Sequence, residues 1–166
     1  EIENHKAGLP SGIRLKLNAI TNFSMIEKLY EASTAGVPIQ MIVRGICCLI
    51  PGVKGMSENI EVISVVDRYL EHPRVYHFTN GGTPKIYISS ADFMTRNIEN
   101  RVEVAAPIYD TDLQRQITEV FDIVWNDNVK ARRLNGPTQN AFIKNDSEPI
   151  RSQFEIFDYY KKEVEK

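Results

Sequence analysis

The chain has 166 residues, of which 42% are apolar and 25% are charged, a composition typical of one folded domain with a sizeable core. Its formal net charge of −2 gives no argument for a nucleic-acid or polyanion partner, so any anion site must be local. No apolar run approaches the ~20 residues that a membrane-spanning helix needs. The first residues are charged and lack both a Met and a signal-peptide core, so we expect a further part of the protein to precede them.

The cysteines are adjacent, at Cys47 and Cys48. Disulfide geometry is hard to reach across one peptide bond, and a zinc site needs more ligands than this pair and three scattered histidines supply. The sequence therefore predicts two buried thiols in a reducing compartment, and no metal held by this chain.

The first third of the chain predicts a strand, a helix and a second strand. Residues 13–17 alternate apolar and basic side chains, the pattern of a half-buried strand. Ser24 and Glu27 have the spacing of a capping box and predict the start of a helix. Residues 37–43 are nearly all apolar and predict a buried central strand. This order is a βαβ unit, which implies parallel strands and a right-handed crossover.

The middle of the chain predicts further strands. Residues 60–65 form one, and residues 74–78 and 85–89 form two more around Asn80-Gly81-Gly82, a strong hairpin signal. Residues 101–104 alternate again and predict another strand.

The last third predicts a helix over residues 111–126 with one apolar face, then a short strand over residues 129–134. Residues 135–148 are polar and predict a surface loop, followed by a last helix that starts near Pro149. The predicted fold class is α/β, with a mixed sheet flanked by helices.

Several blocks of the sequence resemble the signature of the polyphosphate kinases and come in that family's order. They are Ile42 to Leu49 with Pro51-Gly52, Leu70 to Tyr76, Asn80 to Gly82, Ser89 to Asn97, and Arg101 to Val104. The tail from Val129 to Arg132 also fits. The resemblance implies that residues 13–166 are the C-terminal catalytic domain of a larger multi-domain enzyme. Residues 1–12 are then the remainder of an inter-domain linker.

The resemblance also implies a reaction: reversible transfer of the terminal phosphoryl group of ATP to inorganic polyphosphate, through a phosphohistidine. That histidine belongs to the preceding domain, so the chain alone is expected to be inactive. Mg²⁺ would accompany ATP, with ligands outside this chain. The implied partners are ATP, ADP, polyphosphate and the preceding domains, with no nucleic acid. The full enzyme is expected to be a homo-oligomer in the cytoplasm that can associate with a membrane.

The two catalytic domains of the family resemble the phospholipase D fold, in which two similar halves face each other across one site. In that superfamily each half gives a His-x-Lys and a downstream Ser and Asn. The counterparts here are His72-Pro73-Arg74 and the block from Ser89 to Asp92. Arg stands in place of Lys and Asp in place of Asn, which argues against a working phospholipase or nuclease.

Arg44 is the first candidate site residue. It ends the predicted central strand, where ligands of α/β sheets collect, and the following Gly45 lets the backbone approach a ligand closely. Its planar donor fork suits phosphate oxygens, although a structural ion pair would explain it equally well from the sequence alone. The resemblance places a nucleotide-contacting arginine at this position.

His72 is the best catalytic candidate and also a candidate phosphate ligand. A lone histidine is usually a surface or packing residue, but imidazole titrates near neutrality and can donate or accept a proton. The resemblance matches Arg101 to an arginine that lines the family's phosphate tunnel. Arg74, Arg96 and Asp92 are possible channel residues, and Asp92 could instead orient His72 or an arginine.

Arg14 and Lys16 share one strand face, which could line the same channel or simply face solvent. Two rival functions remain. One is a phospholipase D-like phosphodiesterase, against which the missing His-x-Lys argues. The other is a non-catalytic module that binds a nucleotide or polyanion. The sequence contains no Gly-rich Lys motif of the P-loop kinases.

Overall fold

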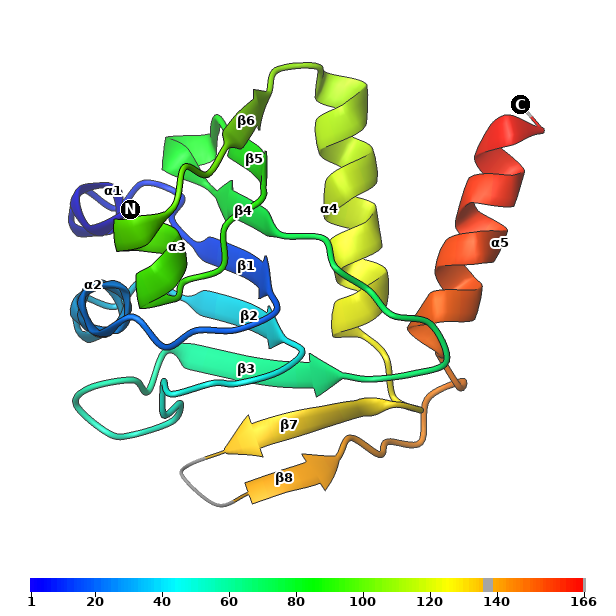
Figure 1. The fold of residues 1–166 in the computed structure, drawn as a ribbon, viewed down its shortest axis with the longest axis horizontal. Coiled ribbons are helices and arrows are strands. Elements are labelled where there is room, and N and C mark those ends of the chain that lie inside the picture. The colour runs from blue at the N-terminus through cyan, green and yellow to red at the C-terminus, as the bar shows by residue number, and fades with distance from the viewer. Residues whose placement is uncertain (136–138, 166) are drawn as a thin grey trace.

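The computed structural model describes residues 1–135 and 139–165, which form one mixed sheet with helices on both faces (Figure 1). The sheet has eight strands in the order β6-β5-β4-β1-β2-β3-β7-β8. Their bounds are β1 Ile13–Leu17, β2 Ile39–Val43, β3 Ile60–Val65, β4 Val75–Phe78, β5 Lys85–Ser89, β6 Ala105–Ile108, β7 Ala131–Asn135 and β8 Gln139–Phe142. The strands β1, β2 and β3 are parallel, and every other pairing is antiparallel. The predicted βαβ unit, mixed sheet and central position of β2 are confirmed.

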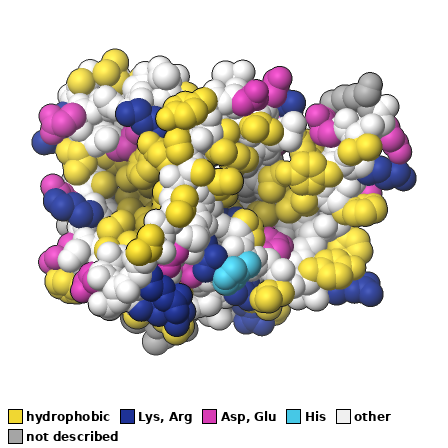
Figure 2. All heavy atoms as spheres, turned by 45° about the horizontal axis from the view of Figure 1, so that its top comes forward, with side chains coloured by type: hydrophobic (Ala, Val, Ile, Leu, Met, Phe, Trp, Pro, Cys, Tyr) yellow, Lys and Arg dark blue, Asp and Glu magenta, His cyan; other side chains and the backbone are white. Residues whose placement is uncertain are grey.

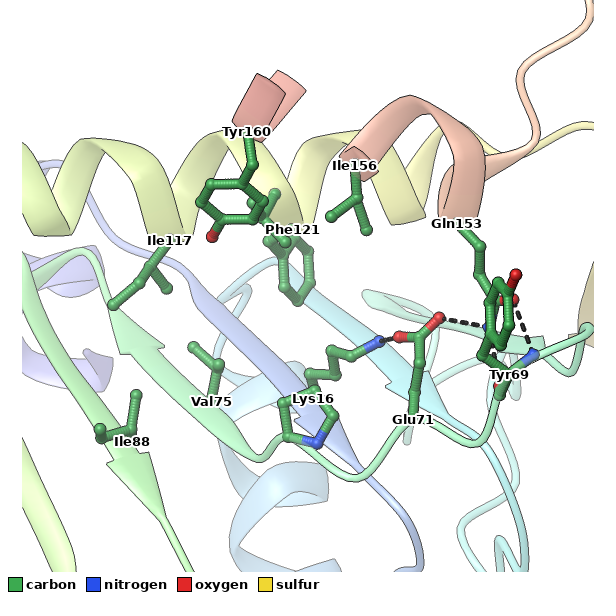
Figure 3. Close-up of a pocket in the computed structure, with 12 residues that line it drawn as sticks. Lys16, Tyr69, Glu71, Val75, Ile88, Ile117, Phe121, Gln153, Ile156 and Tyr160 are labelled. Atoms are coloured by element: carbon green, nitrogen blue, oxygen red, sulfur yellow. Dashed lines mark hydrogen bonds and ion pairs between the residues drawn. The ribbon is translucent and has the colours of Figure 1, made fainter. Parts of the chain in front are cut away.

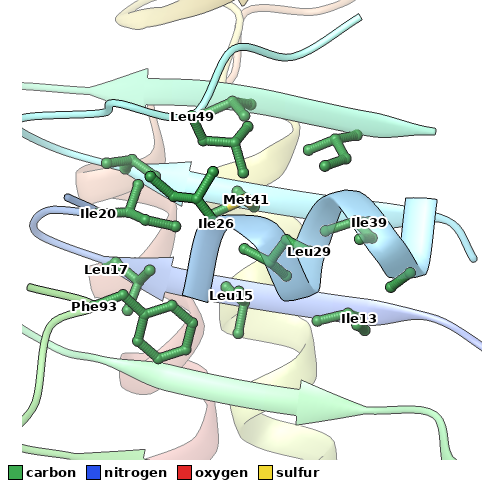
Figure 4. Close-up of a cluster of buried hydrophobic side chains, with 14 of the residues drawn as sticks. Ile13, Leu15, Leu17, Ile20, Ile26, Leu29, Ile39, Met41, Leu49 and Phe93 are labelled. Atoms are coloured by element: carbon green, nitrogen blue, oxygen red, sulfur yellow. The ribbon is translucent and has the colours of Figure 1, made fainter. Parts of the chain in front are cut away.

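The helices are α1 Ile2–Lys6, α2 Phe23–Thr34, α3 Thr95–Asn100, α4 Thr111–Trp125 and α5 Ser152–Val164, with a short 3₁₀ helix at Asn80–Gly82. The helix α2 covers one face of the central strands, whereas α4 and α5 lie behind the opposite face (Figures 1 and 4). None of the described helices is both long and apolar enough to cross a membrane.

The face under α2 holds the larger hydrophobic core (Figure 4). Alternate residues of β1 and β2 point into it, because successive side chains of a strand alternate between faces. Ile26 and Leu29 of α2 close the core from above. Its most deeply buried large side chains include Leu15, Ile20, Ile39 and Met41.

The opposite face holds a smaller core. Ile42 and Ile63 of the sheet pack against Phe121 and Val124 of α4, the two deeply buried members of its predicted apolar face. Ile156 of α5 reaches this cluster but is only partly buried. The helix α5 thus contributes less to the packing of the sheet than α2 does.

The start of α2 differs from the predicted capping box. The helix begins at Phe23, because the side chain of Asn22 accepts a hydrogen bond from the N–H of Met25. Asn22 therefore supplies the cap, and Ser24 lies inside the helix, where it is exposed. The prediction failed because two neighbouring polar residues both suit the cap position.

Residues 101–104 were predicted as a strand, which is wrong. They form no ladder, and β6 begins only at Ala105. The carboxylate of Glu103 accepts hydrogen bonds from Ser90 and Asn97, so the segment folds over the end of α3. The hairpin of β4 and β5 is confirmed, although its connection contains a 3₁₀ turn.

The predicted surface loop of residues 135–148 is also wrong in part, because β8 lies within it and pairs with β7. Gly136 and Pro137, the turn signals in that loop, lie outside the described residues. The last helix starts at Ser152, three residues after Pro149. The leading segment contains α1, whose Ile2 packs against the larger core.

Candidate functional site

The predicted site residues all belong to one edge of the sheet. β1, β2 and β3 run in the same direction, so their carboxyl ends meet at this edge. β4 runs antiparallel to β1 and therefore starts at the same edge, β5 ends there, and β6 starts there. The connections that leave or enter this edge carry every candidate residue.

A cavity of about 480 Å³ opens at this edge. The six residues predicted for the site all line it: Arg44, His72, Arg74, Asp92, Arg96 and Arg101. They come from three different connections of the sheet, β2–β3, β3–β4 and β5–β6, so the convergence depends on the fold and not on closeness in sequence. Their roles in binding or catalysis stay predictions.

Asp92 is the buried centre of this site. One carboxylate oxygen accepts hydrogen bonds from the N–H groups of Asn18 and Ala19, at 2.7 and 3.3 Å. The other accepts from Nη2 of Arg74 at 2.8 Å. Burial acts to raise the pKa of Asp92, but these hydrogen bonds outweigh it and hold the pKa below its ordinary value. The carboxylate is therefore ionised at neutral pH.

Arg74 and Asp92 are the two positions at which the sequence departs from the phospholipase D motif, and they pair with each other. Their side chains are only 11% and 5% exposed. Nη1 of Arg74 also donates to the carbonyl oxygen of His72 at 3.3 Å. Of the two roles considered for Asp92, the geometry shows it orienting an arginine, which in turn contacts the backbone of His72.

Arg44, Arg96 and Arg101 differ from Arg74 because none of them forms an ion pair with a carboxylate of the described residues. Nε of Arg44 donates to the side-chain oxygen of Asn18 at 3.0 Å, which fixes the guanidinium at the rim of the cavity. Arg96 and Arg101 are exposed. These cations are available to an anion that enters the cavity.

The side chain of His72 is exposed and reaches this cavity. Figure 2 shows a His side chain open to solvent beside Lys and Arg side chains on one face of the molecule. The neighbouring Glu71 points elsewhere, because its carboxylate binds Lys16 at 2.7 Å and Gln153 at 2.9 Å. Lys16 therefore does not line this cavity, and neither does Arg14, which pairs with Asp122 of α4. A place for these two residues in a channel stays a prediction.

Two site residues were missed by sequence reasoning. Asn18 holds Arg44 and also donates to Asp92, and it directly follows β1 as Arg44 directly follows β2. Its place at a strand end was a usable signal. Glu103 lines the cavity and accepts from Nδ2 of Asn97 at 2.6 Å, a contact that no sequence pattern indicated.

The described part of the chain holds no group of three or more His, Cys, Asp or Glu side chains placed to bind a metal. Cys47 is half-buried, and its burial raises the pKa of its thiol to about 11. Cys48 is exposed, so the prediction of two buried thiols is wrong for that residue. Successive side chains in this extended stretch point in opposite directions.

Comparison with known proteins gives one consistent result. The family model described as polyphosphate kinase C-terminal domain 2 matches residues 1–153. A polyphosphate kinase of Escherichia coli K12 is 49% identical over 162 residues, which are 97% of this chain and 24% of that protein. The crystal structure of a polyphosphate kinase from Porphyromonas gingivalis superposes with a TM-score of 0.96 at 45% identity, over 99% of this chain and 25% of that one.

A more distant structure shows the fold alone. Nuc from Salmonella typhimurium, a phospholipase D family member, matches 81% of this chain and 89% of its own with a TM-score of 0.59 at 15% identity. The phospholipase D-like fold is therefore confirmed. The chain spans about a quarter of the length of the polyphosphate kinases it matches. On the family model and these identities together, the chain belongs to the polyphosphate kinase family, as its C-terminal domain 2.

Proposed function

We propose that this chain supplies one wall of a site that transfers the terminal phosphoryl group of ATP reversibly to inorganic polyphosphate. The other wall, with the histidine that carries the phosphoryl group, belongs to the preceding part of the full enzyme. The division at residue 12 between linker and domain is part of this proposal. The family and the names of the relatives support the reaction class, and the chemistry of the cavity supports the substrate class.

The observation that carries the proposal is the unequal pairing of charges in the cavity. Four arginines line it against two carboxylates, Asp92 and Glu103, and both carboxylates already accept hydrogen bonds from neighbouring side chains. Arg44, Arg96 and Arg101, which form no ion pair with a carboxylate of the described residues, can therefore bind an anion. Phosphoryl transfer concentrates negative charge on the phosphoryl oxygens, which fixed cations stabilise.

His72 faces the transferred group from this wall and acts as a general acid. It donates a proton to the oxygen that leaves with ADP, and it takes that proton back when the reaction runs in reverse. The contact of Arg74 with the carbonyl of His72 and the extended backbone that Pro73 imposes on His72 support a fixed position for the ring.

The carboxylates of the cavity do not fit a metal site, because Asp92 is held by Arg74 and Glu103 by Ser90 and Asn97. Mg²⁺ is therefore proposed to arrive with ATP and to find its protein ligands elsewhere in the full enzyme. The remaining parts of the proposal are a homo-oligomeric full enzyme, the cytoplasm as its compartment with association to a membrane, and no nucleic-acid partner.

The test is a His72→Ala variant of the full-length enzyme. We expect turnover to fall by about 100-fold or more, within the range of lost acid–base catalysis. The control is His5→Ala, because His5 lies beside Gly36, ahead of β2 and so at the opposite edge of the sheet. Phosphohistidine mapping after incubation with ATP should find the phosphoryl group outside this chain.

Each contrary outcome points to a different error. A stable phosphoryl group on His72 would make it the nucleophile and defeat the acid–base role. Normal turnover in His72→Ala with ATP and polyphosphate still bound would favour the non-catalytic binding module. Cleavage of a generic phosphodiester by the full enzyme would favour the phosphodiesterase.

A further inference from the structure

His72 lies on a connection that has no regular secondary structure. Residues 66–74 link the end of β3 to the start of β4, and none of them is in a helix or a strand. Most of them are exposed, including Tyr69 at 60% and Leu70 at 79%. Since few backbone hydrogen bonds hold such a segment, other contacts must determine where His72 stands.

Apolar packing does not provide those contacts, because the segment lies over a hollow. A cavity of about 390 Å³ lies beside the segment and is bordered also by α4, α5 and the sheet (Figure 3). Tyr69, Glu71 and Pro73 line this hollow from the segment, and Phe121 and Ile156 line it from the helices. A backbone that borders empty space lacks the close contacts that fix side chains in a packed core.

The first turn of α5 holds the segment instead. The side chain of Gln153 accepts a hydrogen bond from the N–H of Tyr69 at 2.9 Å and donates to the carbonyl oxygen of the same residue at 2.8 Å. The same amide nitrogen donates to the carboxylate of Glu71 at 2.9 Å (Figure 3). One side chain therefore binds the segment at three points, and the last is next to His72.

Two ion pairs complete this attachment. Arg151 binds Asp67 through two parallel hydrogen bonds, at 2.8 and 2.7 Å. Lys16 of β1, which is itself buried, binds the other oxygen of Glu71 at 2.7 Å. The segment is thus tied to the start of α5 at Asp67, Tyr69 and Glu71, and to the sheet at Glu71, one residue before His72.

We infer that Gln153 is a positioning residue for His72. The start of α5 holds the connection of residues 66–74 in place through its hydrogen bonds and ion pair. This inference rests on the proposed catalytic role of His72. Gln153 stands outside the cavity that His72 lines, so it acts only through Tyr69 and Glu71. Gln153 determines the position of the imidazole ring and takes no part in the proton transfer itself.

The experiment compares Gln153→Ala with Gln114→Ala in the full-length enzyme. Gln114 is a matched control, since it is also half-buried and donates to a backbone carbonyl, that of Ile108, far from the segment. We expect Gln153→Ala to lower kcat by about 10-fold, since a small misplacement of a catalytic group has effects of this size. KM for ATP should change by no more than about 2-fold, because the arginines that meet ATP are untouched. Both variants should have similar Tm values.

A double variant separates positioning from a general structural effect. If Gln153 acts through His72, then Gln153→Ala should lower kcat in the wild-type background and leave it unchanged in the His72→Ala background. An equal decrease of kcat in both backgrounds would overturn the inference, since the loss would then not pass through His72.

The two failures are distinguishable. Strong impairment of His72→Ala together with normal kcat in Gln153→Ala would overturn the positioning role and leave the proposed function standing. Normal kcat in His72→Ala would overturn the role of His72, and the inference with it. A rise in KM for ATP with kcat unchanged in Gln153→Ala would also overturn it, because lost positioning of a general acid affects kcat.

Discussion

The two faces of the sheet are packed differently, and the difference explains how the site is built. Under α2, Leu15, Met41 and their neighbours form one continuous cluster of buried apolar side chains. Under α5, a hollow of about 390 Å³ interrupts the contact of helix and sheet. The ends of β1 and β2, which carry Asn18 and Arg44, therefore stand on a rigid base. The connection that carries His72 depends on polar contacts instead.

The largest expected effect comes from removing apolar volume on each face. Leu15→Ala should lower the free energy of unfolding by about 2–5 kcal/mol, because the residue is fully buried in the larger core. Ile156→Ala should cost only about 1 kcal/mol, since Ile156 already borders the hollow and few contacts are lost. Urea unfolding of both variants measures the difference. Equal losses would show that the two faces are equally well packed.

An intermediate effect, on kcat/KM for ATP, is expected from replacing Arg44 at the end of β2. Arg44→Ala in the full-length enzyme should weaken the use of ATP by about 1.5–3 kcal/mol, measured from kcat/KM, because a charge-assisted contact is lost. Arg44→Lys should recover little, since a lysine cannot replace the planar donor fork.

Arg133→Ala provides the control for Arg44. Arg133 is an arginine of β7 that pairs with Glu61 at 3.4 Å on an exposed surface. We expect its loss to leave kcat/KM for ATP unchanged, because exposed ion pairs of this kind contribute little. Unchanged kinetics in Arg44→Ala, by contrast, would remove Arg44 from the site.

The part of the site at the ends of β1 and β2, which carry Asn18 and Arg44, was the easier part to predict from local sequence patterns. Apolar runs and the βαβ order were enough to place the carboxyl ends of β1 and β2 side by side, and with them Arg44. A strand ending also marked Asn18, which the prediction overlooked. The family motifs added His72, Arg74, Asp92 and Arg101, and the structure brings these residues to one cavity.

The contacts around His72 could not be predicted in the same way, because they join distant, irregular segments. Nothing in the local pattern shows that Arg74 pairs with Asp92 or that Gln153 binds Tyr69, since 18 residues separate the first pair and 84 the second. The prediction of a strand at residues 101–104 failed for a related reason. Alternation there reflects a turn held by Glu103, and alternation alone does not show whether a neighbouring strand is available.

The last expected effect is the change of stability with pH, and it compares two buried carboxylates, Asp92 and Asp127. Asp92 is held by Arg74 and by two backbone N–H groups. Asp127 accepts from the N–H groups of three residues that enter β7 and from the N–H of Ser152, which starts α5. For each of them burial acts to raise the pKa, and the hydrogen bonds outweigh it, so both pKa values lie below the ordinary one.

The sign of the effect follows from these directions. A carboxyl group whose pKa is lower in the folded than in the unfolded chain, where it is about 3.9, stabilises the fold above that pH. This stabilisation is lost as the pH falls through the lower, folded value. Asp92→Asn and Asp127→Asn should each be less stable than the unchanged chain at pH 7, and each should lose less stability between pH 5 and pH 3.

Urea unfolding across that pH range tests both variants. Their effects on turnover should differ, because the two carboxylates hold different parts of the molecule. Asp92→Asn leaves the buried cation of Arg74 without its partner, so it should also reduce turnover of the full enzyme by disturbing the backbone of His72. Asp127→Asn should affect turnover only through the start of α5, by way of Ser152 and Gln153. A curve of stability against pH that runs parallel to that of the unchanged chain would show that the replaced carboxylate is not held in the folded state as its hydrogen bonds indicate.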